Sequence, residues 1–194
     1  QGYSSAASDV YKRQILLSDR KFAAADTYAT GKTIGTAIKE KLSDFDLIIC
    51  GQFAIDGDTA QTGPSIANTL SIPQVTFVQE ILSYDDGTIT VRRELDDGTE
   101  IIRVKLPALI CVLKDYFEPT RAKINGIKKA INSEIKTYGF EDLGLSAEEV
   151  GLKGSPTYVS KAFRPAPKET ACEFCNTTGE LSKKIHSCLG GQND

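Results

Sequence analysis

Apolar and polar positions follow different periods along this chain, and the period separates expected helices from expected strands. Residues 47–51 form an unbroken apolar run, which is typical of a strand buried on both faces. Residues 34–42 carry apolar side chains three and four positions apart, and residues 62–70 continue in the same way, so both segments predict helices. Residues 15–17 fit the end of another buried strand. The order strand, helix, strand, helix predicts parallel strands in one sheet, joined by right-handed crossovers.

The period shortens to two after residue 73. Asp-Gly pairs at residues 86–87 and 97–98 separate three β-rich runs, and this dipeptide is a strong hairpin signal. We therefore expect three antiparallel strands in this part of the chain. Residues 106–113 then return as an apolar run, which we expect to rejoin the main sheet.

Composition limits the classes of protein to which the chain can belong. Of its 194 residues 40% are apolar and 25% charged, as in an ordinary globular protein, and no stretch approaches the length of a membrane span. The net charge of −3 gives no electrostatic footprint for nucleic acid. Five cysteines without a secretory leader favour a reducing cytoplasm.

The loop after residues 47–51 is the candidate ligand site. Two acids around a glycine, at positions 56–58, follow the strand, and residues 59–62 begin the next helix. Open α/β sheets bind ligands at such an edge, because free N–H groups and the positive end of the helix face the same point. A phosphate would contact Thr59, Gln61, Thr62 and the N–H groups, whereas the two carboxylates would shape the loop or bind a ribose.

Three ordered motifs resemble those of electron transfer flavoprotein beta subunits. The run GQFAIDGDTAQTGPSIANTLSIPQVTFV resembles the family's G-(R/K)-Q-A-I-D-G-D-T-A-Q-x-G-P motif and the G-I-P-Q-V-T that follows it. Upstream, DRKFAAADTYATGKTIGTAIK is similar to DRAFxGADTxATSxTL, and downstream GLKGSPTYVSK is similar to the family's GLKGSPT segment. The wording of the first and last motifs resembles the electron-bifurcating group most. The family's opening strands are absent, so the resemblance implies an N-terminally truncated beta subunit.

The resemblance also implies a fold and a domain division. The expected fold class is α/β, with a HUP-like or Rossmann-like parallel sheet, an antiparallel hairpin insert and an extended C-terminal arm, missing its first strands. We expect a non-native or disordered leader at 1–14, a partial nucleotide-binding α/β domain at 15–136, and a C-terminal arm and tail at 137–194. Because glycines and prolines recur in the arm, it cannot form a core alone, and we expect it to pack against another surface.

The function implied by the resemblance is electron transfer between dehydrogenases and acceptors, by a carrier subunit rather than a stand-alone enzyme. Family beta subunits form a heterodimer with the alpha subunit and bind AMP, or a second FAD in bifurcating complexes; FAD is our first choice here and AMP the alternative. The expected partners are the alpha subunit and an acyl-CoA dehydrogenase or similar flavin dehydrogenase. In the family, a loop that follows the strand ending near residue 113 anchors partner dehydrogenases, and residues 117–121 occupy that place here.

The predicted cofactor-binding residues come from two segments. Capping of a helix is the alternative role for the acid and threonines of the first segment. Lys32 could replace the basic residue that the family usually has where this chain has Gln52. The loop acids could also bind magnesium, although we rank that role second. The full predicted set is Asp26, Thr27, Thr30, Gly31, Thr33, Gly51, Asp56, Gly57, Asp58, Thr59, Ala60, Gln61 and Thr62.

A cysteine cluster near the C-terminus raises the question of a metal site. Cys172 and Cys175, with His186 and Cys188, could bind zinc or form a redox disulfide. If the last segment is helical, however, His186 and Cys188 lie on different faces of the helix. We therefore predict no metal site.

Two other functions remain open from the residues. One is an adenine-nucleotide-binding regulatory module of the universal-stress-like type without redox activity, although such a module needs neither the hairpin insert nor the long arm. The other is a nucleotide-dependent ligase or hydrolase, but the chain has no G-x-S-x-G elbow, Walker A pattern or G-x-G-x-x-G.

Overall fold

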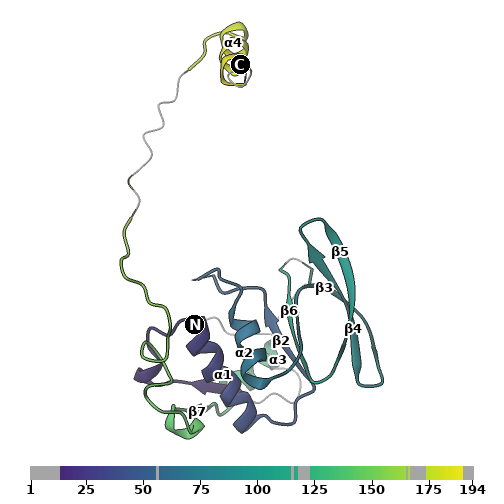
Figure 1. Cartoon of the computed structure of the whole chain (residues 1–194), viewed down its shortest axis with the longest axis vertical. Coiled ribbons are helices and arrows are strands. Elements are labelled where there is room, and N and C mark those ends of the chain that lie inside the picture. Colours follow the sequence, from purple (N-terminus) through teal and green to yellow (C-terminus); the bar gives the residue numbers. More distant parts are fainter. Residues whose placement is uncertain are drawn as a thin grey trace. The chain divides into compact units, whose positions relative to one another are not determined.

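The computed structural model describes residues 14–55, 57–114, 116–117, 123–164, 166 and 174–189 (Figure 1). The chain divides into two units, Gln1–Tyr158 and Val159–Asp194. In the second unit, residues Thr178–Leu189 form the helix α4. Among the described helices, none combines the length and apolarity needed to cross a membrane.

A five-stranded mixed sheet forms the centre of the first unit. Its order is β2-β6-β3-β4-β5, in which β6 pairs in parallel with both β2 and the start of β3, while β3, β4 and β5 are antiparallel. The predicted α/β fold, the three antiparallel strands and the return of the late apolar run to the main sheet are thus confirmed. The strands are β2 (Leu47–Gly51), β3 (Gln74–Asp85), β4 (Thr88–Leu95), β5 (Gly98–Lys105) and β6 (Ala108–Val112).

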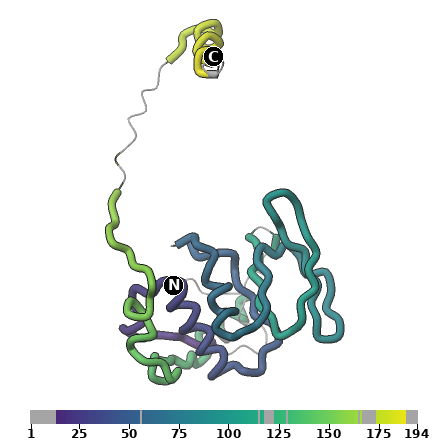
Figure 2. Tube along the Cα trace, in the orientation of Figure 1, coloured from purple at the N-terminus to yellow at the C-terminus, as the bar shows by residue number. Residues whose placement is uncertain are grey.

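Two helices, α1 (Thr27–Lys41) and α2 (Thr62–Leu70), lie side by side, as Figure 2 shows, and α2 packs against the sheet. Small residues let α1 and α2 approach closely. A Cβ on Gly31 would overlap the side chain of Ser65, and one on Gly35 would lie 2.8 Å from the Cβ of Thr69. Likewise, a Cβ on Gly63 of α2 would overlap the sulfur of Cys111 on β6. The glycines therefore let α1 approach α2 closely, and let the beginning of α2 approach β6.

The strand β6, which lies between β2 and β3, contributes to two apolar clusters, since alternate side chains point to opposite faces of a strand. Leu109 and Cys111 pack with Ile66 and Ala67 of α2. Ile110 packs with a separate group on β3 and β4, made of Val75, Val78, Ile89 and Val91. Burial on both faces explains why this strand reads as a continuous apolar run.

The short strand β1 (Ile15–Leu17) pairs in parallel with β7 (Lys136–Tyr138), as a separate two-stranded sheet. The prediction that residues 15–17 and 47–51 share one parallel sheet is therefore wrong. A three-residue strand presents few backbone groups, and here β7 pairs with all three residues of β1. That pairing joins segments far apart in the sequence, which local periodicity does not reveal.

The segment that follows β7 packs on α1. Leu143, Leu145 and Val150 form a buried cluster with Ala37 of α1. At Gly151 the backbone is left-handed, with φ of 58°, and a Cβ there would overlap the Lys21 carbonyl, so only glycine fits without strain. By its contacts, the first unit of the chain extends to Tyr158, and the predicted division into a leader, a domain and an arm stays a prediction. The remaining elements are η2 (Arg20–Phe22), α3 (Ile124–Ile131) and η3 (Glu141–Leu143).

Candidate functional site

The loop between β2 and α2 adopts an unusual backbone. Asp58 and Ala60 have φ of 50° and 55°, in the left-handed region that non-glycine residues seldom occupy. The N–H groups of Gly57 and Asp58 both donate to the Ala54 carbonyl, at 3.3 and 2.9 Å, and close a turn. Strained residues of this kind gather at functional sites. Gly51, at the end of β2, is exposed, and Asp56 lies outside the described residues.

The N-termini of α1 and α2 meet at this loop. Thr27, the first residue of α1, donates from its hydroxyl to the side-chain carbonyl of Gln61, the N-cap of α2, at 3.3 Å. Neither helix has an acidic residue in its first turn. Each helix carries a partial positive charge at its N-terminus, and because the N-cap Asp26 offsets that of α1, the free positive end at this loop is that of α2.

The first N–H groups of helix α2 face the loop between β2 and α2. Gln61 makes no side-chain hydrogen bond to the helix, Pro64 has no N–H, and the Ser65 N–H donates to the Gln61 carbonyl at 3.0 Å. In the first turn, the N–H groups of Thr62 and Gly63 are thus the ones that can donate to a ligand. Thr59 is exposed and Thr62 half-buried. The arrangement suits an anion such as a phosphate.

Asp26 joins the start of α1 to the late GLKGSPT segment. Its carboxylate accepts a hydrogen bond from the Ala29 N–H at 2.9 Å, as an N-cap does, and two from Thr157, from the N–H at 3.0 Å and the hydroxyl at 2.8 Å. The Asp26 N–H donates to the Ser155 hydroxyl at 2.8 Å. Burial raises the pKa of Asp26, but the hydrogen bonds from Ala29, Thr157 and Tyr28 outweigh it, so the pKa lies below its ordinary value.

Ser155 and Thr157 did not figure among the predicted site residues. Their motif was visible in the sequence, but the bonds to Asp26 span about 130 positions, and no local pattern reveals such a pairing. Asp26 therefore caps α1 and holds residues 155–157 against the start of that helix.

Three predicted residues of α1 make contacts within the helical layer. The Thr30 N–H donates to the Asp26 carbonyl at 2.9 Å, and the buried Thr33 hydroxyl donates to the Ala29 carbonyl at 2.8 Å. Gly31 provides the close approach to α2. These contacts explain why small or hydroxyl-bearing residues occur here without reference to a ligand.

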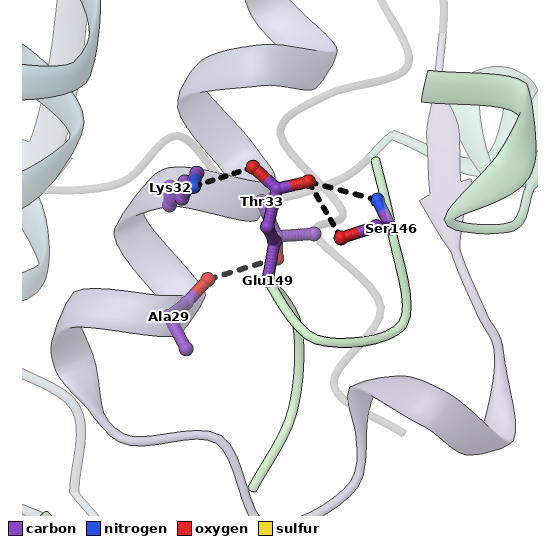
Figure 3. Close-up of polar contacts among 5 residues, drawn as sticks. All are labelled: Ala29, Lys32, Thr33, Ser146 and Glu149. Atoms are coloured by element: carbon purple, nitrogen blue, oxygen red, sulfur yellow. Dashed lines mark hydrogen bonds and ion pairs between the residues drawn. The ribbon is translucent and has the colours of Figure 1, made fainter. Parts of the chain in front are cut away.

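Lys32 pairs with a carboxylate of the chain itself. Figure 3 shows Glu149 between Lys32, whose Nζ lies 2.8 Å from its Oε1, and Ser146, which donates from its N–H at 2.9 Å and its hydroxyl at 2.8 Å. The Lys32 hydrogen bond, followed by those from Ser146, lowers the pKa of Glu149 to about 2. The ammonium of Lys32 therefore fastens the late segment to α1 in this structure.

A hollow and a groove open at the carboxyl ends of the parallel strands. The hollow, of about 90 Å³, is lined by Gln52, Ala60, Thr76, Phe77 and Cys111. A groove of about 500 Å³ shares Gln52, Thr76 and Phe77 and adds Leu113 and the β4 end from Arg93 to Asp96. It extends from the loop toward the β4–β5 hairpin.

Phe77 forms the shared wall of the hollow and the groove. It is 40% exposed, and its φ is 58°, at an irregularity in the pairing of β3 with β6. Such an irregularity re-aims a side chain. Sequence reasoning missed Phe77 and Thr76 as site residues, because alternation predicts a regular strand through them.

The C-terminal cluster does not assemble a metal site in the part of the chain that the structure describes. His186 and Cys188 both lie on α4, two positions apart and hence on different faces. Within the described ranges, no group of three or more metal-ligating side chains gathers. Cys172 lies outside those ranges, as do residues 118–122, which hold most of the expected docking loop.

Comparison with known proteins gives a consistent result. The electron transfer flavoprotein domain matches residues 4–142. The chain is 48% identical over 175 residues to the electron transfer flavoprotein subunit beta of Thermoanaerobacterium thermosaccharolyticum, covering 90% of this chain and 65% of that protein.

Two further proteins are similar to this chain over most of its length. The caffeyl-CoA reductase-Etf complex subunit CarD of Acetobacterium woodii is 44% identical over 175 residues, with 88% of this chain and 66% of the relative covered. Protein FixA of Rhizobium meliloti is 36% identical over 179 residues, with 89% and 61% covered. The chain thus spans between 61% and 66% of the length of these relatives.

Proposed function

Because the chain belongs to the electron transfer flavoprotein family, we propose that it binds an adenine nucleotide as part of a beta subunit that carries electrons between a flavin dehydrogenase and an acceptor. In this proposal the subunit works as a heterodimer with an alpha subunit. The name of the relative CarD refers to a complex with caffeyl-CoA reductase, which supports an acyl-CoA dehydrogenase or a similar flavin enzyme as the partner.

One observation carries the nucleotide site: the N-termini of α1 and α2 are joined by the Thr27–Gln61 hydrogen bond beside the strained loop. A diphosphate there would accept hydrogen bonds from the N–H groups of Thr62 and Gly63 and from the hydroxyls of Thr59 and Thr62. The Asp26 carboxylate, which would repel a phosphate, is held by Ala29 and Thr157 instead. In this proposal the phosphates are held without a metal, since the free N–H groups and the positive N-terminus of α2 favour an anion.

The adjoining groove supports FAD as the ligand, with AMP as the alternative. Its volume of about 500 Å³ lies within the range of pockets that bury small molecules, about 300–1,000 Å³. The half-exposed ring of Phe77 offers an apolar face to a planar ring system, and aromatic pairs add to the area they bury. FAD, when bound, supplies the redox chemistry, while this chain holds the phosphates, orients the ring and limits its contact with water.

Calorimetry on the full-length protein tests the phosphate site. Thr59→Ala removes a hydroxyl that would donate to a charged group, and such a bond is worth about 1.5–3 kcal/mol, so nucleotide affinity should fall roughly ten- to a hundredfold. Thr99→Ala, at an exposed threonine of β5, is the matched control and should leave the affinity unchanged. Equal affinities of the two variants, both folded, would refute the phosphate assignment.

A second titration separates FAD from AMP. If the ring occupies the groove, Phe77→Ala should weaken FAD binding by about tenfold, the equivalent of about 1.4 kcal/mol, and leave AMP binding unchanged. Equal weakening of both ligands would show that Phe77 contacts the shared adenylate part, or that the loop has collapsed. No effect on either ligand would remove the groove from the proposal.

A further inference from the structure

Two cysteines face each other across neighbouring parallel strands. Cys50 on β2 and Cys111 on β6 are register partners, so their side chains leave the sheet on the same face. Helix α2 covers both: a Cβ on Gly63 would overlap the Cys111 sulfur and would lie 3.6 Å from the Cys50 Cβ. The two thiols therefore lie together beneath the first turn of α2.

The spacing of the strands suits a covalent link. Neighbouring strands lie about 4.7–4.9 Å apart, and a disulfide spans Cα atoms about 4.4–6.8 Å apart. Residues in register thus meet this requirement on the spacing of their Cα atoms. Both cysteines are free thiols in this structure.

The surroundings make the two thiols unequal. A hydrogen bond from Cys111 lowers the pKa of Cys50 to about 7, although burial opposes this, whereas the same bond and burial raise the pKa of Cys111. The N-terminus of α2 lies over the pair, and helix N-termini favour thiolates. Cys50 is half-buried, and Cys111, only 2% exposed, lines the 90 Å³ hollow. The lower pKa and the greater exposure favour Cys50 as the nucleophile and Cys111 as the second thiol.

We propose that Cys50 and Cys111 form a redox-sensitive dithiol that closes to a disulfide when a peroxide reaches it. The Cys50 thiolate attacks one oxygen of hydrogen peroxide, the O–O bond breaks, and the products are a sulfenic acid and hydroxide. The Cys111 sulfur then attacks the Cys50 sulfur, the S–O bond breaks, and the leaving hydroxide takes up the Cys111 proton. Overall, two thiols and one hydrogen peroxide give one disulfide and two waters, and a reduced thiol donor such as glutathione reverses the closure by exchange.

A disulfide between Cys50 and Cys111 would change the wall of the hollow. The link would join the ends of β2 and β6 directly before the loop, and the Cys111 sulfur would leave its place in the wall shared with Ala60 and Phe77. The dithiol itself depends only on the sheet register and on α2. It stands independently of the proposed nucleotide site.

The test uses the full chain with its other cysteines removed by Cys172→Ser, Cys175→Ser and Cys188→Ser. After treatment with hydrogen peroxide, mass spectrometry should show the loss of two hydrogen atoms, and a digest should contain one peptide pair linked through Cys50 and Cys111. Dithiothreitol should restore the original mass. The same background with Cys111→Ser should instead gain oxygen at Cys50, because no second thiol is present to displace it.

Further variants keep the outcome interpretable. Cys50→Ser should protect Cys111 from oxidation at the same peroxide dose, and Cys111→Ala replaces Cys111→Ser if the serine variant does not fold. Oxygen addition at both cysteines without a linked peptide would overturn the proposal. So would a link found only between two molecules, or a rate no higher than that of the chain unfolded in urea.

Discussion

Removal of the Asp26 carboxylate should loosen the start of α1 and the late segment together. Loss of an N-cap costs about 1 kcal/mol. The two bonds from Thr157 are exposed, so water replaces them in part, and we assign them about 1 kcal/mol more. Asp26→Ala should therefore lower the free energy of unfolding of the full-length protein by about 2 kcal/mol. Asp26→Asn, which retains a good cap but loses the charge, should lose about half as much.

Urea denaturation monitored by circular dichroism measures this change. Glu40→Ala, at an exposed carboxylate of the same helix, is the control and should change stability by less than about 0.5 kcal/mol. Limited proteolysis within residues 152–158 should be faster in Asp26→Ala than in the control. If Asp26→Ala and Glu40→Ala unfold at the same urea concentration, the cap and the tether contribute no stability and the reasoning fails.

The pH dependence of the same difference gives an independent check. The pKa of Asp26 is lower in the folded protein than the ordinary value of 3.8, because the hydrogen bonds outweigh burial, which raises it. A group of this kind stabilises the fold fully above its unfolded pKa, and the contribution is lost as the pH falls through the folded pKa. The stability gap between the wild type and Asp26→Asn should therefore be constant near neutral pH and close under acid conditions. A gap that widens with acid would contradict the sign.

Three further perturbations probe the layer around the site. Leu109→Ala, in the strand buried on both faces, should destabilise the protein by about 2–5 kcal/mol in urea, whereas Ile101→Ala, at a side chain 64% exposed, should cost less than about 1 kcal/mol; equal effects would contradict the assignment of the core. Gly63→Val should push α2 away from Cys111 and cost about 1–3 kcal/mol in thermal melts, and a melt identical to the wild type would show that the helix is not in close contact with β6. Carbon NMR should find the pKa of Glu149 at about 2, and Lys32→Gln should raise this pKa toward the ordinary value. A pKa that does not move would exclude the ion pair in solution.

Features determined by local chemistry were predictable from the sequence, and features determined by distant contacts were not. The hairpin at residues 86–87 follows from an Asp-Gly pair whose glycine has φ of 68°, a conformation that glycine adopts without strain. The strand β6 was predictable because burial on both faces leaves a continuous apolar run. The β1–β7 pairing, by contrast, joins residues 15–17 to residues 136–138. The three residues of β1 carry no local signal that specifies this partner.

The candidate site divides in the same way. A polar loop between a strand and a helix is a local pattern, so the stretch 57–62 could be singled out in advance, although its role as a ligand site stays a prediction. The Thr27–Gln61 and Asp26–Thr157 contacts arise only when the helices pack and the late segment returns to α1. Phe77 could not be predicted as a wall of the groove, because a bulky residue with positive φ runs against its own backbone preference.

A crystal structure of the full-length protein grown with FAD is the most direct test of the nucleotide proposal. We predict phosphate oxygens within hydrogen-bonding distance of the Thr62 and Gly63 N–H groups and the Thr59 hydroxyl, with the flavin ring against Phe77. FAD bound elsewhere, with the N-termini of α1 and α2 in contact only with solvent or with a protein side chain, would contradict the account.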